Sequence, residues 1–174
     1  MRYVVLFLLT LFFALFNTSF ITYIGILSVL PDIFLIYVVC IGLLEGKITA
    51  GIVGLLGGLF IDTTAGSVLG LYSFVYVVVG IMSGIKLRDF SNENVIRPAI
   101  YAAAATVISG ILIMLITMIS GTHVSFFYCL VRYYLLAVLY NVIIMELVFF
   151  LLRHLYNRNF MAQGISDLEL LLKK

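Results

Sequence analysis

Long apolar stretches alternate with short polar breaks along this chain of 174 residues. A helix that crosses a membrane needs about 20 apolar residues, or fewer where the bilayer thins. Six stretches approach this length, over residues 3–20, 31–44, 48–61, 68–85, 99–120 and 124–152. The pattern predicts an all-α membrane protein, with a six-transmembrane-helix bundle over residues 1–155 and a short cytoplasmic tail over 156–174.

The second and third segments are shorter than the others. We expect them to pack inside the bundle or to lie where the membrane is thin. The alternative is that Glu45, Gly46 and Lys47 form the tight turn of a hairpin that does not fully cross. Full crossing is favoured, because every polar break then carries the charge expected for its side of the membrane.

The basic residues define the expected orientation. With the N-terminus in the cytoplasm, nine of the ten Lys and Arg residues lie on the cytoplasmic side: Arg2, Lys47, Lys86, Arg88, Arg97, Arg153, Arg158, Lys173 and Lys174. The breaks on the other side, 18–30, 62–67 and 120–123, contain no Lys or Arg. This asymmetry follows the positive-inside rule and predicts a multi-pass protein with both termini in the cytoplasm. No small-residue cleavage site ends the first segment, so we interpret it as a retained anchor rather than a secretory signal.

Composition supports membrane insertion and limits the possible functions. The chain is 64% hydrophobic and 10% charged, with a mean hydropathy of +1.26, whereas soluble domains are about 45–50% apolar and about 25% charged. The net charge of +2 and the absence of a dense basic cluster argue against nucleic-acid binding.

Catalytic and metal-binding motifs are missing from the sequence. Cys40 and Cys129 lie inside apolar segments, where thiols behave as small hydrophobic groups, and His123 and His154 lie at segment boundaries. The sequence contains no metal-ligand spacing, no P-loop and no G-x-S-x-G. We therefore expect a protein that is not an enzyme and that needs no metal or cofactor.

Glycines are concentrated in the third and fourth segments. Small residues spaced four apart let two helix backbones approach closely, and three such pairs occur here within about thirty residues. Candidates for helix packing or for a partner interface are Gly51, Gly54, Gly58, Gly66, Gly70, Gly80 and Gly84. Packing within the bundle is the simpler interpretation, and docking of a partner helix is the functional one.

Polar residues inside apolar segments are costly and are therefore candidates for function. They are Asp32, Asp62, Arg132, Asn141 and Glu146. Asp32 follows a proline and suits the start of a helix. Arg132 and Glu146 are fourteen residues apart on one helix, so they share a face but cannot pair with each other. An Asp62–Arg132 pair between helices is geometrically possible.

The remaining polar groups leave two interpretations open. Glu146 could extend toward the inner surface near Arg153 or accept hydrogen bonds from neighbouring helices. Asn141 and nearby tyrosines indicate either a polar cavity or a structural polar interface; the tyrosines are Tyr128, Tyr133, Tyr134 and Tyr140. Two polar stretches, the loop over 86–97 and the tail with a possible amphipathic helix over 166–172, would face the cytoplasm.

Three motifs occur in order in the first half of the chain. Pro31-Asp32 opens the second segment, Gly54, Gly58 and Asp62 form a G-x-x-x-G-x-x-x-D ending of the third, and L-G-L-Y follows at 69–72. Together they resemble the rod shape-determining MreD family, whose length and six spans fit the whole chain. The specific matches lie within 31–84, and the second half matches only in hydropathy and length.

The resemblance implies a non-enzymatic component of the bacterial cell-elongation machinery in the inner membrane. Members of that family work with MreC, a bitopic protein, and with the filament protein MreB, RodA and a class B penicillin-binding protein in the wider assembly. Their fold is similar to that of the substrate-binding subunits of energy-coupling-factor transporters. The alternative function is therefore binding of a small molecule such as a vitamin, in a pocket that would use Asp62, Tyr128 and Arg132.

Overall fold

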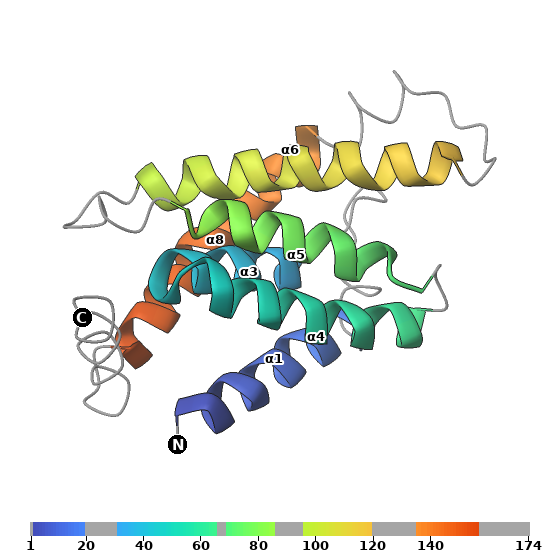
Figure 1. Ribbon diagram of the computed structural model, residues 1–174. Helices are drawn as coiled ribbons and strands as arrows, with labels where there is room; N and C mark the ends of the chain where they lie inside the picture. Colours follow the sequence, from blue (N-terminus) through green and yellow to red (C-terminus); the bar gives the residue numbers. More distant parts are fainter. Residues whose placement is uncertain (1, 20–30, 66–68, 86–95, 120–134, 157–174) are drawn as a thin grey trace, which may run out of the picture.

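The computed structural model describes residues 2–19, 31–65, 69–85, 96–119 and 135–156, and all the regular structure in these ranges is helical. The helices are α1 (Arg2–Ser19), α3 (Ile33–Glu45), α4 (Lys47–Ala65), α5 (Leu71–Ser83), α6 (Ile96–Ile119) and α8 (Leu135–Tyr156). They form one bundle (Figure 1). The predicted all-α class is confirmed, and each predicted segment overlaps one of these helices, although the bounds differ by up to eleven residues. The predicted cytoplasmic tail, most of the loop over 86–97, and Arg132 lie outside the described residues.

Three helices are long and apolar enough to cross a membrane, judged by length and composition: Lys47–Thr64 in α4, Pro98–Met118 in α6 and Leu136–Tyr156 in α8. The chain is therefore a membrane protein by this criterion. The helices α1, α3 and α5 are apolar but shorter. With 13 residues, α3 is about 20 Å long, against about 30 Å for the hydrocarbon core. Six crossings remain a prediction.

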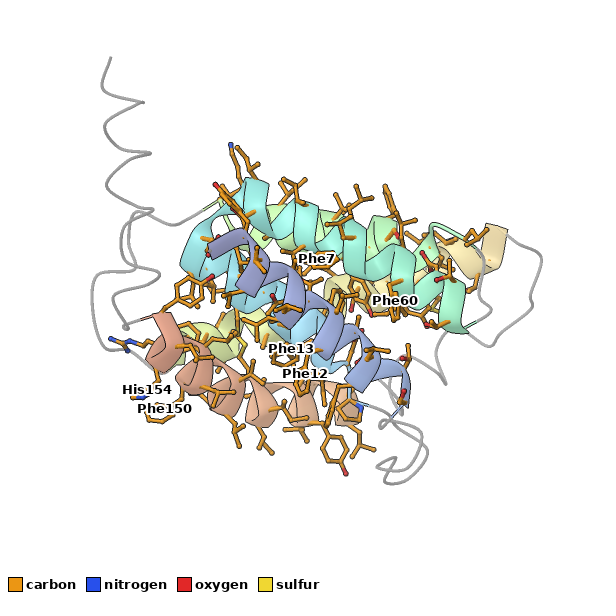
Figure 2. The ribbon with its side chains drawn as sticks, turned by 90° about the horizontal axis from the view of Figure 1, so that it is seen from below. Phe7, Phe12, Phe13, Phe60, Phe150 and His154 are labelled. Atoms are coloured by element: carbon orange, nitrogen blue, oxygen red, sulfur yellow. The ribbon has the colours of Figure 1, made fainter. Side chains whose placement is uncertain are left out.

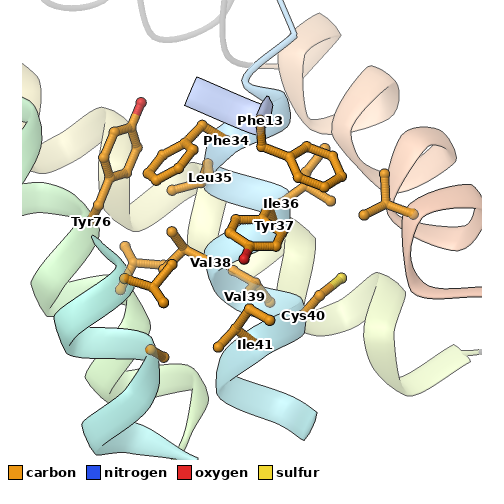
Figure 3. Packing of buried hydrophobic residues seen from close by; sticks show 14 of the residues in the cluster. Phe13, Phe34, Leu35, Ile36, Tyr37, Val38, Val39, Cys40, Ile41 and Tyr76 are labelled. Carbon is orange, nitrogen blue, oxygen red and sulfur yellow. The ribbon is translucent and has the colours of Figure 1, made fainter. Parts of the chain in front are cut away.

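Helix α3 is the centre of the bundle. All ten residues from Phe34 to Leu43 are buried, and α1, α4, α5, α6 and α8 all contact α3. Figure 3 shows Phe13 of α1 beside Tyr37, and Tyr76 of α5 beside Phe34. The Phe13 and Tyr37 rings stack at 4.5 Å between centroids, and Phe34 meets Tyr76 edge-on at 5.0 Å. A helix that is apolar on every face is expected in such a position.

The surrounding helices present apolar side chains on their outer faces. Tyr3 and Phe12 of α1, Ile52 of α4 and Phe150 of α8 are all more than half exposed. Phe150 lies on the outside of the bundle in Figure 2, where the outer apolar side chains are drawn as sticks. Such surfaces are stable in lipid, whereas a soluble monomer rarely exposes a large apolar patch.

The helices alternate in direction (Figure 1), so the connections between them lie at two opposite ends of the bundle. At one end, Gly46 alone separates α3 from α4 and has a φ of 98°, a conformation that glycine adopts easily. The Tyr156 hydroxyl at the end of α8 donates a hydrogen bond to Glu45 at this same end, which also carries Lys47 and Arg153. The opposite end carries Asp32 and the α4–α5 connection. Which end faces the cytoplasm stays a prediction from the charge pattern.

Candidate functional site

Asp32 begins the central helix and joins it to α5. It is the N-cap of α3, and its Oδ1 accepts a hydrogen bond of 3.0 Å from the Leu35 amide. Its Oδ2 accepts a second bond of 2.9 Å from the hydroxyl of Tyr76 on α5. Both carboxylate oxygens therefore have partners, and Asp32 has the helix-start position expected from the sequence.

Asn141 extends these contacts to α6 and α8. Its side chain is 1% exposed, and its Oδ1 accepts a 3.1 Å bond from the Asp32 amide. Its Nδ2 donates a 3.0 Å bond to Thr106 Oγ1 on α6, and Thr106 in turn donates to the Ala102 carbonyl. We call Asp32, Tyr76, Thr106 and Asn141 the Asp32 network, which connects α3, α5, α6 and α8.

The Asp32 network behaves chemically as a structural joint. Buried polar groups cost free energy unless they are hydrogen-bonded, and here each member bonds to another member or to backbone. Hydrogen bonds between membrane helices are worth roughly 0.6–2 kcal/mol each. Of the two interpretations offered for Asn141, the contacts correspond to the structural polar interface. Tyr128, Tyr133 and Tyr134 lie outside the described residues.

Asp62 connects the end of α4 to the start of α5. It is 1% exposed, and its carboxylate accepts bonds from the amides of Gly70, Tyr72 and Ser73 at 3.0, 3.0 and 3.2 Å, and from the Ser73 hydroxyl at 3.0 Å. A carboxylate at this position satisfies the amides of the first turn and complements the helix dipole. Since Arg132 lies outside the described residues, the Asp62–Arg132 pair stays a prediction.

The glycines of α4 and α5 pack these two helices against each other. A Cβ on Gly54 would lie 2.6 Å from the Tyr76 carbonyl oxygen, and a Cβ on Gly58 would lie 2.5 Å from Ser73 Cα. From the α5 side, a Cβ on Gly80 would lie 2.8 Å from the Ala50 carbonyl oxygen, and one on Gly84 would lie 2.2 Å from the Lys47 amide nitrogen. This corrects the hypothesis that the glycine face receives a helix of a partner, because α5 already occupies that face.

The other candidate glycines have different surroundings. A Cβ on Gly51 would meet only the Ile81 side chain, at 3.3 Å. Gly70 has a φ of 94°, and a Cβ added to it would have no atom within 4 Å, so it serves the turn before α5 rather than helix packing. Gly66 lies outside the described residues.

Glu146 differs from the other acidic candidates. Its side chain is partly exposed on the flank of α8, and no hydrogen bond or ion pair joins it to another residue of the described ranges. Arg153, on the same helix, is exposed near the α8 end. Seven residues separate the two, which is about 10 Å along the helix. Neither contact suggested for Glu146 is formed within the described part of the chain.

Sequence reasoning did not identify two members of the Asp32 network, Tyr76 and Thr106. Tyr76 is one aromatic among eleven tyrosines, and threonines in membrane helices commonly bond to their own backbone, as Thr106 also does. Their contacts with Asp32 and Asn141 join helices far apart in sequence. The one sequence signal for Tyr76 and Thr106 is that each carries a hydroxyl within an apolar segment.

Neither a metal site nor a similarity to a known protein assigns a function to this chain. In the ranges that the structure describes, no three His, Cys, Asp or Glu residues are grouped so that they could hold a metal ion. Comparisons of the chain with protein-family models, with curated proteins and with solved structures found no match.

Proposed function

We propose that this chain is a non-enzymatic inner-membrane scaffold of the bacterial cell-elongation machinery that binds MreC and supports lateral peptidoglycan synthesis and cell shape. The observation that carries the proposal is a bundle in which buried Asp32, Asn141 and Asp62 are hydrogen-bonded, while the outer faces are mainly apolar. Asp32, Asn141 and Asp62 bond to neighbouring helices, while large apolar side chains cover the outer faces. Such a molecule is suited to holding other membrane proteins.

The residues that resemble the MreD family each have a defined role in this bundle. Asp32 starts the central helix, Gly54 and Gly58 admit α5, and Asp62 holds the first turn of α5. The motifs thus describe one connected unit, α3–α4–α5, rather than three unrelated coincidences. This connection supports the proposal, and the role in elongation is inferred from the resemblance of the motifs.

Under this proposal, MreC binds through its membrane helix and its periplasmic part, and the outer apolar faces also contact membrane lipid. The loop over 86–97 and the C-terminal tail face the cytoplasm, where MreB lies. RodA and a class B penicillin-binding protein belong to the wider assembly. The alternative, a vitamin-binding transporter subunit, has less support, because Asp62 is engaged by four donors of the α4–α5 connection and α5.

Co-purification tests the proposal. The full chain with an affinity tag is co-expressed in its host with the MreC protein of that host, extracted in mild detergent and purified. We expect MreC to be recovered with the chain, and we expect cells depleted of the chain to lose their rod shape. Absence of MreC together with normal shape would overturn the scaffold role, and a vitamin retained by the purified chain would favour the transporter role.

A further inference from the structure

Helix α8 has the smallest buried share of the three candidate spans. Only 22% of the α8 span is buried inside the bundle, compared with 39% for the α4 span and 33% for the α6 span. Its exposed residues recur every three or four positions and form one stripe, which we call the α8 stripe: Leu139, Ile143, Leu147, Phe150 and Leu151. Lipid alone could cover such a stripe.

Glu146 makes lipid an unfavourable cover. It lies ten residues from each end of the 21-residue span Leu136–Tyr156, which is about 15 Å from either end. A glutamate side chain is too short to reach the membrane surface from that depth, and an acidic group in hydrocarbon costs several kcal/mol by insertion measurements. It is only partly buried by the bundle, and the described residues supply no hydrogen bond or ion pair to it.

The negative charge of Glu146 indicates the kind of helix that would bind here. We propose that the α8 stripe is the docking surface for a single membrane-spanning helix of another protein that carries a Lys or Arg near its middle, and that this side chain pairs with Glu146. An apolar flank would pack on the stripe, and the ion pair would fix the depth of the docked helix. Ionisable residues within membrane segments commonly pair with one another in this way.

A second copy of this chain fits less well than a basic helix. Two copies related by a two-fold axis present the same surface to each other, so two Glu146 carboxylates would meet. Like charges at close range repel, whereas a basic side chain would attract the carboxylate and offset part of the cost of both charges. The docking surface itself does not depend on the proposed scaffold role. Only the choice of the elongation partner MreC as its natural occupant rests on that role.

A synthetic helix provides a test that does not depend on the natural partner. The full chain, labelled with a fluorophore, is reconstituted in phosphatidylcholine vesicles with leucine–alanine membrane peptides that carry Lys or Leu at the centre. We expect energy transfer to the Lys peptide to indicate binding about three- to thirty-fold tighter than to the Leu peptide. Glu146→Leu should abolish this preference. Leu56→Ala, which changes an exposed residue of α4, should leave it unchanged.

The same variants tested with MreC separate this inference from the proposed function. If wild type recovers MreC and Glu146→Leu recovers at least threefold less while Glu146→Leu stays folded by circular dichroism, the docking surface is supported. If both recover MreC equally, or the Lys peptide shows no preference, the docking surface is overturned and the scaffold role stands. If wild type recovers no MreC, the scaffold role fails, whereas the peptide preference still decides the docking surface. Disulfide crosslinking between Leu147→Cys copies would instead support a dimer and overturn the inference.

Discussion

One carboxylate oxygen of Asp62, Oδ2, accepts two hydrogen bonds from Ser73. The Ser73 amide donates at 3.2 Å and the Ser73 hydroxyl at 3.0 Å. Directly beside this contact, Gly58 brings the α4 backbone against the Ser73 backbone. A close backbone approach and a charged cap therefore meet at the same turn of α5. This joint connects α4 to α5, and α3 packs against both helices.

Removing the cap should destabilise the bundle. We expect Asp62→Ala to lower the free energy of unfolding by about 1–3 kcal/mol, because three amides and one hydroxyl lose a charged acceptor. Unfolding in mixed micelles with increasing SDS, followed by circular dichroism, measures the change. Thr63→Ala is the matched control, since Thr63 is exposed and, among the residues that the structure describes, its hydroxyl bonds only to the Phe60 carbonyl. Equal unfolding midpoints for Asp62→Ala and Thr63→Ala would contradict the role of Asp62 as the cap of α5.

Adding a side chain at the close contact between α4 and α5 should also destabilise the bundle. Gly58→Ala places a Cβ 2.5 Å from Ser73 Cα, so the two backbones must separate, which costs roughly 1–3 kcal/mol. Gly51→Ala is the control on the same helix. Its Cβ meets only a flexible Ile81 side chain, and alanine has about 1 kcal/mol better helix propensity than glycine. In the same SDS titration, Gly58→Ala should lower the unfolding midpoint. Gly51→Ala should raise the midpoint or leave it unchanged.

The Asn141–Thr106 contact should appear as a coupling energy. Asn141→Leu and Thr106→Val each remove one side of a 3.0 Å hydrogen bond between buried groups. The double variant should be less destabilised than the sum of the single variants, with a coupling of about 0.6–2 kcal/mol. A double-mutant cycle on unfolding free energies measures it. Strict additivity would mean that the hydrogen bond contributes nothing to stability.

Helix α4 should connect opposite sides of the membrane. Lys47 and Thr63 are exposed near its two ends and are separated by about 24 Å along the helix. In a Cys129→Ser background, where Cys40 is fully buried, we expect Lys47→Cys to react with an impermeant thiol reagent from the cytoplasmic side only. Thr63→Cys should react from the other side only. Labelling of both from one side would favour the hairpin that does not fully cross.

Hydropathy predicted the helices well because lipid imposes a simple rule. A chain that buries all its backbone polar groups in hydrocarbon must form helices, so an apolar run between polar breaks is enough to place α3 and α4. The predicted segment 31–44 corresponds to Ile33–Glu45, and 48–61 to Lys47–Ala65. The third segment proved longer than expected, because Asp62 and the two threonines after it continue the helix.

The arrangement of the helices was not predictable in the same way. Helices in lipid are apolar on their inner and outer faces alike, so the sequence of α3 does not by itself show that α3 is central. The partner of Asp32 on α5, Tyr76, is 44 residues away, and Asn141 on α8 is 109 residues away. Nothing local to these residues specifies which helices become neighbours.

The enclosed position of α3 constrains how the protein is made. Residues 33–45 leave the ribosome long before α8, yet α8 supplies Asn141 to Asp32 and Tyr156 to Glu45, at opposite ends of α3, and Met145 to Cys40 between them. Until α8 is synthesised, one side of α3 is covered only by lipid or by the insertion apparatus. Biogenesis of this bundle must therefore keep an unfinished core in the membrane and close it with α8.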